Sequence, residues 1–170
     1  MIRPPAEPIV IGLGGNLGGD AAIRERFDRA RASLTVIGPV RSARLYRTAP
    51  IGPGQPAYLN TALRLAAPDA QPGELIAMLL EIEQLLGRRR AGEARWGPRP
   101  IDLDVLVWGA RTVRTPELEV PHPRLAERRF ALLPLIDLLG EDFVVVGHGP
   151  AGELARRVAG QECEAIAATW

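Results

Sequence analysis

Residues 101–107, Ile-Asp-Leu-Asp-Val-Leu-Val, constrain the fold more than any other stretch of the chain. The run is rich in branched apolar residues, follows two prolines and ends close to a glycine, a pattern that predicts a β-strand. Side chains alternate across a strand, so Asp102 and Asp104 are expected to point together from one face. The apolar residues are expected to share the other face: Ile101, Leu103, Val105 and Val107. The fold must therefore accommodate two neighbouring acids on a mostly apolar strand.

Two neighbouring carboxylates repel each other and are costly to desolvate unless a cation lies between them. Magnesium suits such a pair, because it commonly takes one or two protein carboxylates and fills its remaining positions with water and phosphate oxygens. The alternative is an exposed strand face whose acids pair with Arg95 or Arg99. The spacing alone leaves both interpretations open.

A cluster of arginines precedes the two aspartates. Five lie within twelve positions: Arg88, Arg89, Arg90, Arg95 and Arg99. Guanidinium groups beside a cation site can bind a polyanion such as a phosphate chain, so the cluster favours the magnesium interpretation. A solvated surface loop is the alternative for these arginines.

Composition excludes several other classes of function. The chain has 170 residues, 46% of them hydrophobic and 24% charged, so we expect one soluble domain over residues 1–170 with a flexible extension at residues 1–8. The net charge of +1 creates no global field for nucleic acid or an anionic membrane. All 21 basic residues are arginine, which excludes Schiff-base chemistry and a phosphate loop with its usual lysine.

Cys163 is the only cysteine, so an intramolecular disulfide and a cysteine-based zinc site are excluded. A reduced cytoplasm fits this cysteine usage. No apolar run is long enough to cross a bilayer. We therefore expect a cytoplasmic protein with neither membrane nor nucleic-acid partners.

The order of the expected elements predicts the fold class. Strands are expected at 9–13, 40–46, 57–65, 101–107 and, at an edge, 143–146. Helices are expected after Asp20, from Pro72, at 124–139 with a break or kink at Pro134, and at 152–159. This order predicts an α+β protein with a ferredoxin-like βαββαβ core, an antiparallel-containing sheet, helices on one face, and an appended C-terminal hairpin and helices.

Three features of the sequence place polar residues or glycines where the expected secondary structure does not explain them. Asn60 lies in mid-strand, where asparagine is disfavoured, so it either bonds a loop or reads the edge of a ligand. Glu83 lies near a helix C-terminus, where the helix dipole disfavours acids, so we expect it to be exposed or paired with an arginine of the next loop. The glycine run 14–19 has Leu17 where a Rossmann spacing requires glycine, which favours a tight strand-to-helix turn.

Together these residues resemble one family, the 6-hydroxymethyl-7,8-dihydropterin pyrophosphokinases of folate biosynthesis. The resemblance runs from about Ile9 to Leu139, and its longest motif is Arg95-Trp96-Gly97-Pro98-Arg99-Pro100-Ile101-Asp102-Leu103-Asp104. The other matching stretches follow in the expected order: Gly14-Gly15-Asn16-Leu17, Tyr46-Arg47-Thr48, Tyr58-Leu59-Asn60, Glu83 with Gly87-Arg88-Arg89-Arg90, Val120-Pro121-His122-Pro123-Arg124 and Arg128-Arg129-Phe130.

The resemblance implies transfer of the β,γ-diphosphate of ATP to the hydroxymethyl oxygen of 6-hydroxymethyl-7,8-dihydropterin, with release of AMP. It implies that Asp102 and Asp104 bind two Mg²⁺ ions and that Arg88 and Arg90 belong to a mobile loop that closes on the nucleotide. The residues that it assigns to catalysis are Arg88, Arg90, Arg99, Asp102 and Asp104. Those that it assigns to ATP are Glu83, Arg90, Arg95, Arg99, His122 and Arg128. Packing within its own loop is the alternative role for His122.

The resemblance also implies a site for the flat pterin. The residues that it assigns there are Leu45, Thr48, Tyr58, Asn60, Trp96 and Phe130. Trp96 and Phe130 would sandwich the ring, while Asn60 and Thr48 would read its amide-like edge, helped by backbone near Leu45. Core packing is the alternative for the two aromatic residues.

Two other functions compete with this enzyme. A non-catalytic nucleotide or pterin binder would not require two paired acids. An RNA-binding module could use a ferredoxin-like sheet, but aromatic residues make up only 5% of the chain and its net charge is near zero. We therefore expect an ATP-dependent diphosphokinase, a transferase that acts as a monomer on small molecules.

Overall fold

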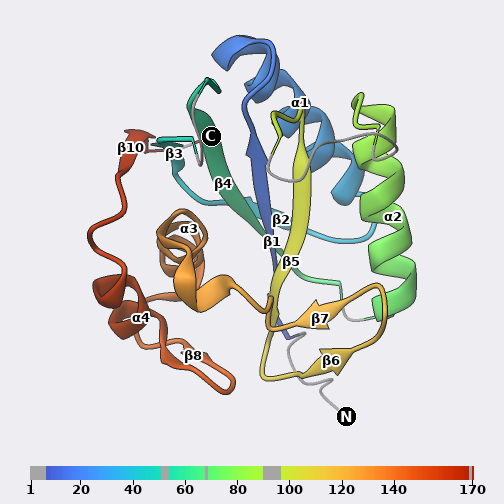
Figure 1. The fold of residues 1–170 in the computed structure, drawn as a ribbon. Helices are drawn as coiled ribbons and strands as arrows, with labels where there is room; N and C mark the ends of the chain where they lie inside the picture. Colours follow the sequence, from blue (N-terminus) through green and yellow to red (C-terminus); the bar gives the residue numbers. More distant parts are fainter. Residues whose placement is uncertain (1–6, 51–53, 68, 90–96, 169) are drawn as a thin grey trace.

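A six-stranded sheet lies at the centre of the computed structural model, which describes residues 7–50, 54–67, 69–89, 97–168 and 170 (Figure 1). Its strands are β1 (Ile9–Gly15), β2 (Val40–Ser42), β3 (Leu45–Thr48), β4 (Tyr58–Leu65), β5 (Asp102–Trp108) and β10 (Cys163–Ala167). They run in the order β10-β3-β4-β1-β5, and β2 also pairs with β4. Every pairing in this sheet is antiparallel.

Helices cover both faces of the sheet (Figure 1). The helices α1 (Gly19–Leu34) and α2 (Pro72–Leu85) pack against one face and share an apolar core with its inward side chains. On the opposite face, α3 (Arg129–Leu139) and α4 (Ala151–Arg157) form a second core with Val10, Ala62 and Leu106. The predicted mixed α and β fold around an antiparallel sheet is confirmed. The expectation of helices on one face holds for α1 and α2, whereas α3 and α4 cover the other face. None of the helices in the described part of the chain has the length and apolar character needed to cross a bilayer.

Two small hairpins stand apart from this sheet. One joins β6 (Val113–Arg114) to β7 (Glu119–Val120), and the other joins β8 (Val144–Val145) to β9 (Gly149–Pro150). The prediction that residues 143–146 add an edge strand is therefore wrong. The edge is formed by β10, which pairs with β3 and which the sequence pattern did not predict.

A bulge divides the strand expected at 40–46. Ser42 pairs with Leu63 and Tyr46 pairs with Asn60, so three residues of one strand face two of β4. Such an extra residue interrupts the ladder and bends the strand. Thr61 Oγ1 stabilises the bulge by donating to the Arg44 carbonyl at 2.9 Å.

A second irregularity, in β5, overturns one predicted orientation. Val105 pairs with Ile11, and Val107 pairs with the preceding residue Val10, so Leu106 is the extra residue. Leu106 and Val107 consequently both pack into the core on the α3 side. The expectation that Val107 shares a face with Val105 is wrong, because strand alternation does not continue through a bulge.

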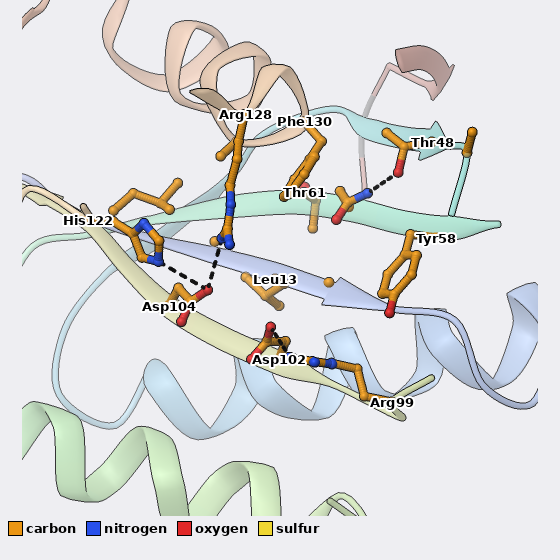
Figure 2. A pocket seen from close by; sticks show the side chains of 16 residues that line it. Leu13, Thr48, Tyr58, Thr61, Arg99, Asp102, Asp104, His122, Arg128 and Phe130 are labelled. Atoms are coloured by element: carbon orange, nitrogen blue, oxygen red, sulfur yellow. Dashed lines mark hydrogen bonds and ion pairs between the residues drawn. The ribbon is translucent and has the colours of Figure 1, made fainter. Parts of the chain in front are cut away.

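The expected break at Pro134 occurs earlier, at Arg128. A 3₁₀ turn, η1 (Leu125–Glu127), is followed by Arg128 in extended backbone with φ −122° and ψ 99°, and α3 begins at the next residue. Pro134 lies inside α3 without ending it. The break places Arg128 at the N-terminal end of α3, and its side chain points toward β5 (Figure 2).

Asp137 anchors α3 to the sheet at the bulge between β2 and β3. Its carboxylate accepts hydrogen bonds from Arg44 Nη2 at 2.6 Å, from the Arg44 backbone N–H at 3.1 Å and from the Tyr46 hydroxyl at 2.8 Å. The Tyr46 side chain is buried, and burial together with Asp137 raises the pKa of its phenol. The contact fixes where α3 lies across the sheet.

Asp137→Ala should destabilise the fold by about 3 kcal/mol, because it removes several charge-assisted hydrogen bonds and leaves the buried Tyr46 hydroxyl without its acceptor. Tyr46→Phe removes a single bond and should cost about 1 kcal/mol. Urea unfolding of the two variants and the wild type measures both values. Equal midpoints for Asp137→Ala and the wild type would contradict the anchoring role.

Candidate active site

A cleft opens between the sheet and the start of α3, and Figure 2 shows the side chains that line it. The empty space within it, which includes solvent on its open side, is about 910 Å³. The lining residues come from β1, β3, β4, β5, the loop that contains His122, and α3. Segments far apart in the sequence therefore build one site.

The floor of the cleft is the backbone of β1. In the sheet register Gly14 lies between Asn60 of β4 and Asp102 of β5, and Gly12 lies opposite Asp104. A methyl group added at Gly14 would come within 3.0 Å of Asn60 Oδ1. The two glycines thus leave space above the sheet between the acids and Asn60. The predicted tight turn from strand to helix is confirmed at Gly18 and Gly19, which have positive φ angles between the end of β1 and the start of α1. The role of Gly12 and Gly14 is shown only by the sheet register.

Asp102 points into the cleft from β5 and is bound by two arginines. Its carboxylate accepts a hydrogen bond from Arg99 Nη1 at 2.9 Å and another from Arg88. The interpretation in which an acid pairs with Arg99 therefore describes Asp102. It does not describe Asp104, which faces the same cleft two residues further along the strand (Figure 2).

Asp104 is the acid that most requires a cation. Its Oδ2 lies 3.8 Å from His122 Nε2 and 4.0 Å from Arg128 Nη1, and its side chain keeps 38% of its surface exposed. The pKa of Asp104 is raised to about 7, first because the cleft removes water from the carboxylate and then because Asp102 repels a second negative charge. Arg128 opposes this shift without reversing it.

Oxygen donors arranged like these fit a divalent ion. Magnesium binds through one or two carboxylates and takes its other ligands from water and phosphate. Within the described ranges, no group of three or more His, Cys, Asp or Glu side chains could hold a metal ion. Asp102 and Asp104 would therefore supply two of the ligands of a magnesium ion, and water or phosphate oxygens could fill its other positions.

Glu83 and Arg88 form a buried ion pair next to Asp102. Glu83 Oε1 accepts hydrogen bonds from Arg88 Nη1 at 2.8 Å and from the Leu103 backbone N–H at 2.7 Å. The two residues are only 1% and 8% exposed, so the predicted pairing of Glu83 is confirmed and its exposed alternative is wrong. At this exposure Glu83 offers no surface to a nucleotide. It acts on the site by joining α2 to β5 and holding Arg88 against Asp102.

His122 is positioned as a neutral hydrogen-bond donor. Its Nδ1 accepts from the Arg124 backbone N–H at 3.1 Å, which places the proton of the neutral ring on Nε2, toward Asp104. Burial and the charge of Arg128 lower the pKa of His122 to about 4. At neutral pH the ring can donate to an oxygen in the cleft without carrying a charge.

The other end of the cleft is more apolar and carries an amide. Asn60 Nδ2 donates to Thr48 Oγ1 at 2.8 Å, so Asn60 bonds a neighbouring strand rather than a loop. Tyr58 and Phe130 line the same end from opposite sides (Figure 2). An aromatic ring facing an amide across an open floor can hold a flat heterocycle.

Among the described residues that the resemblance implies, Glu83, Arg88 and Leu45 do not line the cleft. Arg90, Arg95 and Trp96 lie outside the described residues. The side chain of Leu45 is buried in the core shared with α1 and α2, and the contact implied for the backbone near it stays a prediction.

Asn16 is a positioning residue whose role sequence reasoning did not assign. It is buried, its Oδ1 accepts from the Arg99 backbone N–H at 2.9 Å, and its Nδ2 donates to the Pro56 carbonyl at 3.2 Å. Its backbone N–H also donates to the Arg99 carbonyl at 3.0 Å. Asn16 therefore ties three loops together and fixes Arg99 beside Asp102. Its place directly after the glycines in a shared motif was the available signal.

Replacing Asp104 by Asn should stabilise the protein when no divalent ion is present. The pKa of about 7 in the folded protein exceeds the ordinary 3.8, so the wild-type carboxyl costs stability as pH rises from about 4 to about 7, and no more above that. The gain in melting temperature of the variant should grow over the same window and then level off. Thermal unfolding in a chelator measures it, with exposed Asp142→Asn as the control. A gain independent of pH would contradict the electrostatics described above.

Comparison with known proteins identifies the family. The family model for 7,8-dihydro-6-hydroxymethylpterin-pyrophosphokinase (HPPK) matches residues 10–140. A 2-amino-4-hydroxy-6-hydroxymethyldihydropteridine pyrophosphokinase from Methylorubrum extorquens is 37% identical over 147 residues, which cover 86% of this chain and 90% of that protein. The Bacillus subtilis protein of the same name is 37% identical over 133 residues, covering 75% of each.

Other relatives are longer. A folate synthesis bifunctional protein from Arabidopsis thaliana is 38% identical over 142 residues, which are 80% of this chain but 28% of that protein. The chain likewise spans 30% of the related protein from Pisum sativum.

Solved structures agree with the fold. An HPPK-DHPS in complex with substrates superimposes with a TM-score of 0.69 at 12% identity, over 90% of this chain and 43% of that one. Wild-type HPPK-DHPS from Plasmodium falciparum gives a TM-score of 0.67 at 12% identity, over 92% of this chain and 45% of that one. Because the family match includes both aspartates and the described residues around them, the chain belongs to the 7,8-dihydro-6-hydroxymethylpterin-pyrophosphokinase family.

Proposed function

We propose that this chain transfers the β,γ-diphosphate of ATP to the hydroxymethyl group of 6-hydroxymethyl-7,8-dihydropterin, as a step of folate biosynthesis. The bond from Pβ to the oxygen that bridges it to Pα breaks, and a bond from Pβ to the hydroxymethyl oxygen forms as the hydroxyl proton is released. AMP leaves with the bridging oxygen. The observation that carries the proposal is the pair Asp102 and Asp104, which share one open cleft with an amide and an aromatic ring.

The acidic end of the cleft suits the triphosphate. We propose that Asp102 and Asp104 hold two magnesium ions there, which offset the charge of the phosphates and lower the pKa of the attacking hydroxyl when bound. Asp104 supports this assignment because the loss of water from its carboxylate and, next, the charge of Asp102 raise its pKa, and Arg128 does not fully offset these effects.

Basic and neutral donors surround the position proposed for the phosphates. Arg99 and Arg128 line the cleft on either side of the two acids. We propose that they contact phosphate oxygens as bidentate donors, and that His122 donates from Nε2. Phosphoryl transfer depends mainly on holding its partners in line and offsetting charge, which these groups do. Arg90 and Arg95 keep their proposed phosphate contacts as predictions.

The opposite end suits the pterin. We propose that the ring lies on the glycine floor against Phe130, with its amide-like edge at Asn60 and Thr48. Asn60 carries both a donor and an acceptor, so it can match an edge that has both. Trp96 is the proposed second aromatic partner.

The remaining expectations stay predictions. The strand order and its alternating directions support the ferredoxin-like βαββαβ plan. We also propose that the protein works as a cytoplasmic monomer on small molecules, without nucleic acid. A non-catalytic binder on the same fold has no specific observation in its favour, and the next experiment separates it from the enzyme.

Asp102→Ala and Asp104→Ala should each lower AMP formation from ATP and the hydroxymethyl pterin by about 10³-fold or more, since a metal site contributes several kcal/mol to the transition state. Removing Mg²⁺ with a chelator should have the same effect on the wild type. Exposed Asp142→Ala should retain wild-type turnover. Full turnover in the double alanine variant would refute the metal assignment, and pterin binding without AMP formation in the wild type would favour the non-catalytic binder.

Phe130→Ala should raise the KM for the pterin by about tenfold, because stacking on the ring is lost. The KM for ATP should change much less. Phe130→Tyr retains the ring and serves as the matched variant, with a KM close to that of the wild type. Steady-state kinetics with each substrate varied in turn measure both constants. Equal increases in the two KM values would contradict the assignment of Phe130 to the pterin.

A further inference from the structure

Residues 158–167, the C-terminal segment, lie beyond the region matched by the family model and contact both walls of the cleft. The segment follows α4 in a turn, in which the Gln161 backbone N–H donates to the Val158 carbonyl at 3.1 Å, and then continues as β10. Figure 1 shows it in red, passing α3 on its way to the edge of the sheet.

Gln161 holds the backbone on both sides of Arg128. Its Nε2 donates to the Glu127 carbonyl at 2.7 Å, and its Oε1 accepts from the Arg129 backbone N–H at 2.9 Å. Arg128 is the extended residue between η1 and α3, where the regular hydrogen bonding of a helix is interrupted. A side chain from the C-terminal segment therefore fixes the point at which Arg128 and Phe130 enter the cleft.

Arg129 adds hydrogen bonds between the start of α3 and the C-terminal segment. Its Nη1 donates to the Ala159 carbonyl at 2.7 Å and to the Gln161 carbonyl at 2.9 Å. The guanidinium of Arg129 thus binds the C-terminal segment, although the sequence places this residue between two that line the cleft. Side-chain and backbone groups of both segments take part, so the contact is reciprocal.

Two residues after Gln161, the C-terminal segment also pairs with the opposite wall of the cleft. In the pairing of β10 with β3, Cys163 lies opposite Thr48. Thr48 is the residue whose hydroxyl accepts from Asn60. One short segment thus bonds the wall that carries Arg128 and Phe130 and the strand that carries Thr48.

We propose that Gln161 is a positioning residue for pterin binding, which sets the distance of Phe130 from Thr48 and Asn60 across the cleft. This inference rests on the proposed function and deepens it. Gln161 touches neither substrate: it acts through the backbone of residues 127–129. Gln161 lies beyond the family match, so residues 10–140 alone would lack the hydrogen bonds that it makes to the backbone of Glu127 and Arg129.

Gln161→Met is the test, because methionine has a similar length and makes neither hydrogen bond. Loss of two neutral hydrogen bonds predicts about a tenfold rise in the KM for the pterin and in its dissociation constant. Exposed Glu162→Ala, one residue along the same segment, is the control and should match the wild type. Both variants are assayed well below their melting temperatures.

A double-mutant cycle with Phe130→Ala separates positioning from general destabilisation. If Gln161 acts by placing Phe130, its effect on the pterin KM should largely disappear once the ring is absent. A lowered melting temperature with unchanged pterin KM would overturn the inference, as would an effect of full size in the Phe130→Ala background. A wild type that neither binds pterin nor forms AMP would instead refute the proposed function, and this inference with it.

Discussion

Repulsion between Asp102 and Asp104 is the constraint on which the site depends. Two carboxylates on one face of a strand raise the free energy of the folded chain, and the surrounding structure offsets this for only one of them. Asp102 has two guanidinium partners, whereas Asp104 has basic groups at longer range and a raised pKa. The imbalance leaves the charge of Asp104 incompletely offset at the position where we propose that a divalent ion binds.

The walls of the cleft are held by polar contacts at its edges rather than by the apolar core alone. Asp137 fixes α3 to the bulge in the sheet, and Asn16 fixes the segment before β5 to two other loops. Glu83 fixes the arginine that neutralises Asp102. Each contact joins residues far apart in the chain, so the geometry of the site is a property of the whole fold. Local stretches of sequence specify only its parts.

Strand alternation was sufficient to predict that Asp102 and Asp104 share a face, and the helices expected after Asp20 and from Pro72 are α1 and α2. The orientation of Val107 could not be predicted in this way, because a bulge depends on which residues the facing strand presents. The burial of Arg88 depends on two partner acids, Glu83 on a helix and Asp102 on a strand, which a run of arginines does not show. The role proposed for Gln161 depends on the contact of its side-chain amide with the backbone of residues 127–129, which the composition of the chain cannot predict.

The glycines in β1 have a consequence for how the pocket can change. A ligand on this floor lies against peptide groups, and no single substitution elsewhere in the chain removes a peptide group. Variation that alters ligand preference is therefore confined to the rim, where side chains such as Thr48 and Phe130 stand. For an inhibitor that makes its main contacts with the floor, a mutation could block binding by adding a side chain there. It could not remove the peptide groups that the inhibitor contacts.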